Sequence, residues 1–231
     1  MRTVLFIICT LLTAACAYVT VYFMKACRDK SYKSAAVFKT LAGLCFVIIG
    51  LLLAAAMSAD KRFAWLVALG LVFGLLGDVL LAIRFMKPER HNFYFIVGAV
   101  SFAVGHGLYI LAMLTKYEPS LAVALTIGII GLAAAGVYAK AKKTDAGHYT
   151  LLGGLYMALV VGMGAIAIGS ATAAPGAATL LFAAGGILFP VSDSVLCAYS
   201  FGPDDRFGMN IAIHATYYLA QLCIAWSLAW I

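Results

Sequence analysis

FAWLVALGLVFGLLGDVLLAI, residues 63–83, is a long apolar run that contains a single charged side chain, Asp78. A helix of about 20 apolar residues is long enough to cross the hydrocarbon core of a bilayer. The run does not alternate polar and apolar residues, as a strand of a membrane β-barrel would. We therefore expect residues 63–83 to form a transmembrane helix.

Similar runs fill the rest of the chain. Hydrophobic residues make up 65% of the 231 residues and charged residues 11%, whereas a soluble domain carries about 25% charged residues. The sequence predicts an all-α, multi-pass membrane protein that forms one transmembrane domain over residues 1–231. The eight spans that we expect are 3–24, 36–57, 63–83, 93–114, 119–139, 149–171, 177–199 and 209–230.

The basic residues indicate an orientation rather than a nucleic-acid site. The net charge is +7, but the connections are too short to form a solvated domain that could bind nucleic acid. Twelve basic residues follow spans 1, 3, 5 and 7: Lys25, Arg28, Lys30, Lys33, Lys39, Arg84, Lys87, Arg90, Lys140, Lys142, Lys143 and Arg206. The opposite side has four: Arg2, Lys61, Arg62 and Lys116. The positive-inside rule then predicts cytoplasmic basic loops and outside termini, and we favour a bacterial inner membrane.

The amino-terminal run has two interpretations. Residues 1–19 resemble a secretory signal peptide, with Arg2 followed by apolar and then small residues. The run continues to Met24, before Lys25, and is longer than the apolar part of most signal peptides. We therefore expect an uncleaved first helix.

The six cysteines show no CxxC pairing. Five of them lie in apolar runs, where a cysteine is most often a small apolar filler. We expect neither disulfide bonds nor a metal cluster.

Two short patterns recur about half a chain apart. GDVLLA (residues 77–82) ends the third span, and SDSVLCA (residues 192–198) ends the seventh. HGLY (residues 106–109) lies in the fourth span, and HATY (residues 214–217) lies in the eighth. Some membrane folds consist of parallel repeats, so the patterns suggest two parallel four-helix halves. Chance matches of this length are the alternative.

Two carboxylates stand apart from the other seven, because only Asp78 and Asp193 lie inside apolar spans. A charge in that position costs several kcal/mol, so such residues usually face the bundle interior and serve a function. The helical rise places Asp78 roughly 9 Å and Asp193 roughly 13 Å from the basic edge of the membrane. We take both as candidate catalytic residues; an aspartate that only bonds a neighbouring helix is the alternative.

Other polar residues lie near the same edge of the spans. Lys39 could contact a phosphate or could extend to the headgroups without a specific partner. His106 lies deeper, roughly 20 Å from His91 along its helix, and either contributes to a site or only bonds a neighbouring helix. The supporting residues that we expect are Lys39, Asn92, Tyr94, His106, Tyr109, Ser192, His214 and Tyr218.

Signatures of other enzyme classes are missing from the sequence. It contains no GxSxG elbow and no HExxH motif. No two histidines share a helix at the i, i+3 or i, i+4 spacing of metal ligands. We expect neither a metal nor another cofactor.

Several of these motifs together resemble the YhhN family of lysoplasmalogenases. The matching residues, in order over nearly the whole chain, are Gly77-Asp78, Leu80-Leu81, Gly98, Ser101-Phe102, His106, Tyr109, Ser192-Asp193 and Tyr217-Tyr218-Leu219-Ala220-Gln221. The resemblance implies hydrolysis of the vinyl ether bond of alkenyl lysophospholipids to a fatty aldehyde and glycerophosphoethanolamine or glycerophosphocholine. The expected partners are this substrate and membrane lipids.

The chemistry of a vinyl ether suits two aspartates. Protonation at carbon gives an oxocarbenium-like cation that water attacks, so a carboxylic acid and a carboxylate serve the two steps. We expect Asp193, on a span with few charges, to be the acid. Asp78, closer to basic residues, is then the carboxylate.

Two rival functions remain from the sequence. A transporter with a 4+4 helix repeat would place its polar site near the membrane midplane, whereas most polar residues here lie in one half of the membrane. A lipid-binding membrane protein without catalysis is the third possibility.

We expect the site to face the cytoplasmic leaflet.

Overall fold

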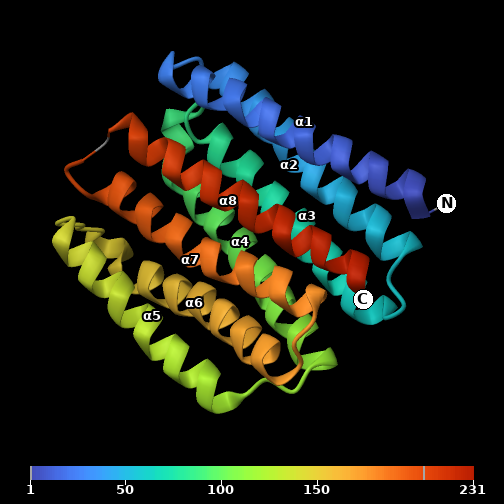
Figure 1. Ribbon diagram of the computed structural model, residues 1–231. Coiled ribbons are helices and arrows are strands. Elements are labelled where there is room, and N and C mark those ends of the chain that lie inside the picture. Colours follow the sequence, from blue (N-terminus) through green and yellow to red (C-terminus); the bar gives the residue numbers. More distant parts are fainter. Residues whose placement is uncertain (1, 205) are drawn as a thin grey trace. The chain divides into compact units, whose positions relative to one another are not determined.

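The computed structural model describes residues 2–204 and 206–231, which form eight long helices and three short 3-10 turns, with no strand in these ranges (Figure 1). The long helices are α1 (Arg2–Arg28), α2 (Tyr32–Ala56), α3 (Lys61–Ile83), α4 (His91–Lys116), α5 (Leu121–Ala141), α6 (Thr150–Ala173), α7 (Ala177–Phe201) and α8 (Phe207–Ser227). The turns are η1 (Pro88–Arg90), η2 (Gly147–Tyr149) and η3 (Leu228–Trp230). The predicted all-α class and the number of spans are confirmed.

The surfaces of these helices are apolar. Along α5, the large side chains Leu121, Leu125 and Ile129 are exposed, while polar side chains such as Asp78 and His106 are buried. A soluble protein avoids such extended exposed apolar surface. All eight helices are long and apolar enough to cross a membrane, so the chain is a multi-pass membrane protein.

Helix boundaries follow local sequence signals. The Asp60 carboxylate accepts a hydrogen bond from the Phe63 backbone N–H at 3.0 Å and so caps α3. Proline cannot donate the backbone hydrogen bond that continues a helix, and four prolines lie between the long helices: Pro88, Pro119, Pro175 and Pro203. Pro190 lies inside α7, which continues through it.

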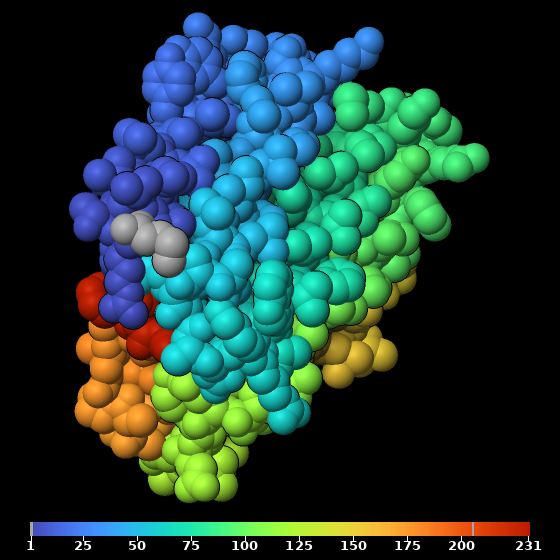
Figure 2. Space-filling view, turned by 90° about the vertical axis from the view of Figure 1, so that its right-hand side faces the viewer, coloured from blue at the N-terminus to red at the C-terminus, as the bar shows by residue number. Residues whose placement is uncertain are grey.

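The chain divides into two compact units, and the first contains residues up to Ala112 together with Leu228–Ile231. Within it, α2 packs against both α1 and α3, and Figure 2 shows the light-blue α2 between the dark-blue α1 and the teal α3. Helix α4 is joined to α3 where Ser101 Oγ donates to the Phe73 carbonyl at 2.7 Å. The segment after α8 returns to α2, since Ser58 Oγ donates to the Leu228 carbonyl at 2.9 Å.

The second unit contains Met113–Ser227. Within it α7 packs against α6 and α8, and α5 packs against α6 (Figure 1). The Asp145 backbone N–H donates to the Phe201 carbonyl at 2.9 Å, which joins the connection after α5 to the end of α7. The division at Met113 falls within the last turn of α4. The arrangement of the chain as two parallel four-helix halves stays a prediction.

Charged side chains interact at the end of α7. Arg206 donates two hydrogen bonds to Asp204, at 2.8 and 2.7 Å, and these bonds lower the pKa of the Asp204 carboxyl to about 2. Lys142 Nζ, beyond the end of α5, lies 3.8 Å from the same carboxylate. Three charged groups therefore meet at this end of the second unit.

Candidate functional site

The first intramembrane carboxylate, Asp78, forms an ion pair with Lys39. Lys39 Nζ on α2 lies 3.1 Å from Asp78 Oδ1 on α3, and the two side chains are 12% and 1% exposed. Gly43 follows Lys39 by one helical turn, and a Cβ there would lie 2.6 Å from Leu75 Cδ1. The glycine lets α2 approach α3 closely, which brings the ammonium to the carboxylate. Lys39 therefore contacts a carboxylate rather than extending freely to the headgroups.

The second intramembrane carboxylate, Asp193, accepts a hydrogen bond from a tyrosine. The Tyr156 hydroxyl on α6 donates to Asp193 Oδ2 on α7 at 2.9 Å. Asp193 is buried, and no salt bridge reaches it from the described residues. Its hydrogen-bond partner is thus neutral, whereas the partner of Asp78 is a cation.

Ser192 connects α7 with α8 beside Asp193. Its hydroxyl donates to the Ile213 backbone carbonyl at 2.9 Å, and both residues are buried. This bond holds the turn of α7 that carries Asp193 against α8. The contact lies one residue before Asp193 in the sequence, and a supporting role for Ser192 stays a prediction.

A buried polar stripe runs along α8. His214 Nδ1 lies 2.8 Å from the Asn210 carbonyl, one turn earlier. The ring of Tyr218 lies 6.4 Å from that of His214, and Gln221 Nε2 donates to the Tyr217 hydroxyl at 3.1 Å. The expected residues His214 and Tyr218 thus belong to one connected stripe of the second unit.

His106 and Tyr109 are buried together on α4 in the first unit. Their ring centroids lie 6.1 Å apart in an edge-to-face arrangement. The Tyr109 ring covers Gly70 of α3 so closely that a Cβ at Gly70 would collide with it. Gly70 therefore allows α3 and α4 to pack closely, as small residues do in other membrane helices.

Asn92 and Tyr94 lie at the start of α4 and are less enclosed. Asn92 is exposed, and Tyr94 is half-buried with its ring 5.5 Å from Phe93. No hydrogen bond or ion pair joins either side chain to Asp78 or Asp193 among the described residues. A supporting role for them stays a prediction.

Tyr156 is the contact that the sequence did not indicate. It lies in an apolar run, where a tyrosine is typical of a lipid or core contact, and Asp193 is 37 positions away. Only the packing of α6 on α7 brings its hydroxyl to the carboxylate.

Metal-ligating side chains do not gather in the described part of the chain. No group of three His, Cys, Asp or Glu residues there could hold a metal ion. The six cysteines are free thiols.

Comparison with known proteins yields a family match. No solved structure matches the chain. The YhhN family model matches residues 34–228, a segment that begins in α2 and contains both intramembrane aspartates and their partners Lys39 and Tyr156. Because this match covers most of the chain, the protein belongs to the YhhN family.

Proposed function

We propose that this protein is a membrane hydrolase that cleaves the vinyl ether bond of alkenyl lysophospholipids, releasing a fatty aldehyde and glycerophosphoethanolamine or glycerophosphocholine. The observation that carries the proposal is the pair of intramembrane carboxylates with different partners, Lys39 for Asp78 and Tyr156 for Asp193. They are the only carboxylates within the eight long helices of the described chain. Membership of the YhhN family supports the same activity.

The reaction needs a proton donor and a group that stabilises the cationic intermediate. An acid adds a proton to the vinyl carbon remote from the ether oxygen, which leaves an oxocarbenium cation. Water adds to the carbon bonded to oxygen and loses a proton, giving a hemiacetal that breaks into the aldehyde and the glycerol hydroxyl. One water is consumed and the acid is regenerated. A carboxylic acid and a carboxylate divide these steps, as they do in glycoside hydrolysis.

The partners of the aspartates support a division of roles. The Lys39 ammonium stabilises a negative charge on Asp78, so Asp78 acts as the carboxylate that stabilises the cation and activates water. Asp193 accepts only a neutral hydrogen bond and is buried in an apolar span, where an uncompensated charge is costly. Asp193 is therefore the acid that protonates the vinyl carbon.

The depth of the aspartates supports a lipid substrate that is bound from one leaflet of the membrane. Asp78 lies five residues before the end of α3, and Asp193 lies eight residues before the end of α7. At the rise of a helix, these positions are roughly 8 and 12 Å inside the helix ends. The sn-1 ether bond of a lysophospholipid lies just beneath its headgroup, at a comparable depth. The basic residues near these ends favour the cytoplasmic leaflet of a bacterial inner membrane.

The test is aldehyde release by purified variants. Asp78→Asn and Asp193→Asn preserve side-chain volume but remove the carboxyl chemistry. We expect each to lower turnover by about 10²–10⁴, the usual contribution of a general acid or base. Aldehyde is measured with an alkenyl lysophospholipid in detergent micelles.

Glu118→Gln is the matched control, because Glu118 is an exposed carboxylate in the connection between α4 and α5. It should keep the parent rate. Each variant is checked for its elution volume and helical circular dichroism. Near-normal turnover in a folded Asp78→Asn or Asp193→Asn protein removes that residue from the mechanism.

A further inference from the structure

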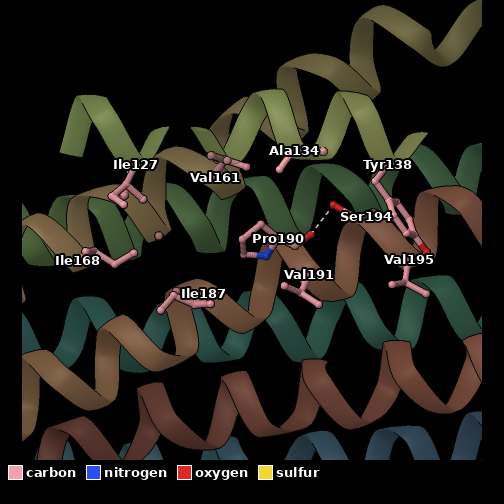
Figure 3. A pocket seen from close by; sticks show the side chains of 15 residues that line it. Ile127, Ala134, Tyr138, Val161, Ile168, Ile187, Pro190, Val191, Ser194 and Val195 are labelled. Carbon is pink, nitrogen blue, oxygen red and sulfur yellow. Dashed lines mark hydrogen bonds between the residues drawn. The ribbon is translucent and has the colours of Figure 1, made fainter. Parts of the chain in front are cut away.

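An apolar groove opens between α5, α6 and α7 in the second unit. Its volume is about 420 Å³, and all of its lining residues belong to these three helices. Figure 3 shows Ile127, Ile168 and Ile187 at one end and Tyr138, Ser194 and Val195 at the other. The middle is formed by Ala134 and Val161 on one side and Pro190 on the other (Figure 3).

Small residues create this groove. On α5, Gly131, Ala134 and Ala135 contribute no atom beyond a methyl group to the wall. Gly164 of α6 and Gly186 of α7 approach so closely that a Cβ on Gly164 would collide with the Gly186 backbone. The backbones of α6 and α7 therefore meet at these glycines, and the small residues of α5 leave the groove open beside them.

The interior of the groove offers little to a polar ligand. Ser194 Oγ already donates to the Pro190 carbonyl at 2.6 Å, and the Tyr138 hydroxyl lies at one end (Figure 3). A polar ligand or water would lose hydrogen bonds there without replacing them. The lining helices are all long and apolar enough to span a membrane, so lipid hydrocarbon is the ligand class that this surface meets.

Basic residues lie near one end of the groove. Lys142 Nζ lies 5.9 Å from the centre of the Tyr138 ring, and Lys140 and Lys143 flank it in the sequence. Lys142 is also the side chain that approaches Asp204 at 3.8 Å. An apolar groove that ends beside lysines suits an amphiphile with one hydrocarbon chain and an anionic headgroup.

The same end is close to Asp193 along α7. Pro190 and Ser194 line the groove, and Asp193 lies between them in the same helical turn, less than about 5 Å along the axis from either. A chain in the groove with its headgroup near Lys142 would bring its first carbons to the level of Asp193. The sn-1 linkage of a lysophospholipid occupies that part of the molecule.

We infer that the groove between α5, α6 and α7 binds the hydrocarbon chain of the lysophospholipid substrate, with the phosphate at the Lys142 end. The inference rests on the proposed function, because it identifies the chain as that of the substrate. The length of the groove then sets which chain lengths are preferred. Tyr138 and Val195 mark the entrance, and Ile127, Ile168 and Ile187 mark the distal end.

Photocrosslinking tests occupancy without needing turnover. The probe is an alkyl ether lysophospholipid, which cannot be hydrolysed at a vinyl bond, with a diazirine in its chain. A diacyl phospholipid with the same diazirine chain serves as the comparison. We expect the lysolipid probe to label peptides of α5, α6 and α7, and an excess of unlabelled alkyl lysophospholipid to suppress the labelling.

Ala134→Phe fills the groove, and Ala133→Phe is its matched control on the same helix. Ala133 is exposed and does not line the groove. Ala134→Phe should lower competed labelling and long-chain turnover by about tenfold or more, with a smaller loss for a short-chain substrate. Ala133→Phe should stay within about twofold of the parent. Ala134→Leu, a smaller change, should give an intermediate effect.

Several outcomes contradict the inference. Equal labelling by the diacyl probe without competition indicates an ordinary boundary lipid. Labelling confined to other helices, or crosslinks between two copies through α5, shows that another ligand covers the groove. Competed labelling without aldehyde release from any substrate supports the groove as a lysolipid site and contradicts the proposed function, so the two ideas fail separately.

Discussion

The ion pair of Lys39 with Asp78 is largely shielded from solvent, since the two side chains are 12% and 1% exposed. Removing one member leaves the other charge without its compensating partner in an apolar span. We expect Lys39→Met to destabilise the protein by about 3 kcal/mol, near the low end for buried pairs because the Lys39 side chain is 12% exposed. The measurement is the midpoint of thermal unfolding in detergent.

The double variant Lys39→Met/Asp78→Asn isolates the pair. Removing both charges should recover more than half of the loss seen in Lys39→Met, because no uncompensated carboxylate remains. Lys39→Arg is the conservative control and should melt close to the parent. Additive losses in the double variant would show that the two side chains are not coupled.

Single residues also show what the sequence could reveal about the site. Asp78 and Asp193 could be found because a carboxylate inside an apolar run is costly and rare. The Tyr156 contact could not be found, because a tyrosine in such a run has no distinguishing spacing and its partner lies on another helix. Lys39 could be identified because it lies near the same edge of the membrane as the aspartates. Its pairing with Asp78 could not be predicted, because it depends on the close approach of α2 to α3 at Gly43.

At the scale of helices, the contact between α6 and α7 depends on glycine. A Cβ at Gly164 would collide with the backbone of Gly186, which cannot move as a side chain can. We expect Gly164→Ala to destabilise the protein by about 1–3 kcal/mol, the usual cost of overpacking. Unfolding in detergent, followed by circular dichroism, gives the value.

Gly162→Ala is the control on the same helix. Nothing lies within 4 Å of a Cβ at Gly162, so this change should be neutral or slightly stabilising, since alanine favours a helix more than glycine does. Equal behaviour of the two variants would mean that α6 and α7 do not meet at Gly164.

The helices themselves could be predicted almost completely. Their lengths follow from the thickness of a bilayer, and their ends follow from prolines and caps such as Asp60. The pairing of helices could not be predicted, since apolar faces of similar composition offer no unique partner. The pairing depends on close glycine contacts such as that of Gly164 with Gly186, and these contacts are visible only in the structure.

At the scale of the whole molecule, the distribution of basic residues predicts the orientation. A cysteine at position 142, made as Lys142→Cys in a background lacking the six native cysteines, should be shielded from an impermeant thiol reagent in intact cells. A cysteine added after Ile231 should react. Permeabilised cells should label both. Labelling of the first and shielding of the second in intact cells would reverse the orientation and move the site to the other leaflet.

The central claim is that the protein protonates a vinyl ether carbon. The most direct measurement uses purified protein in D₂O with an alkenyl lysophospholipid. The aldehyde is trapped as it forms and its mass is determined by mass spectrometry. The acyl analogue is assayed in parallel. The account predicts an aldehyde with one deuterium on the carbon next to the carbonyl, and no fatty acid from the acyl analogue. Aldehyde without deuterium, or fatty acid released from the acyl analogue at a comparable rate, would contradict it.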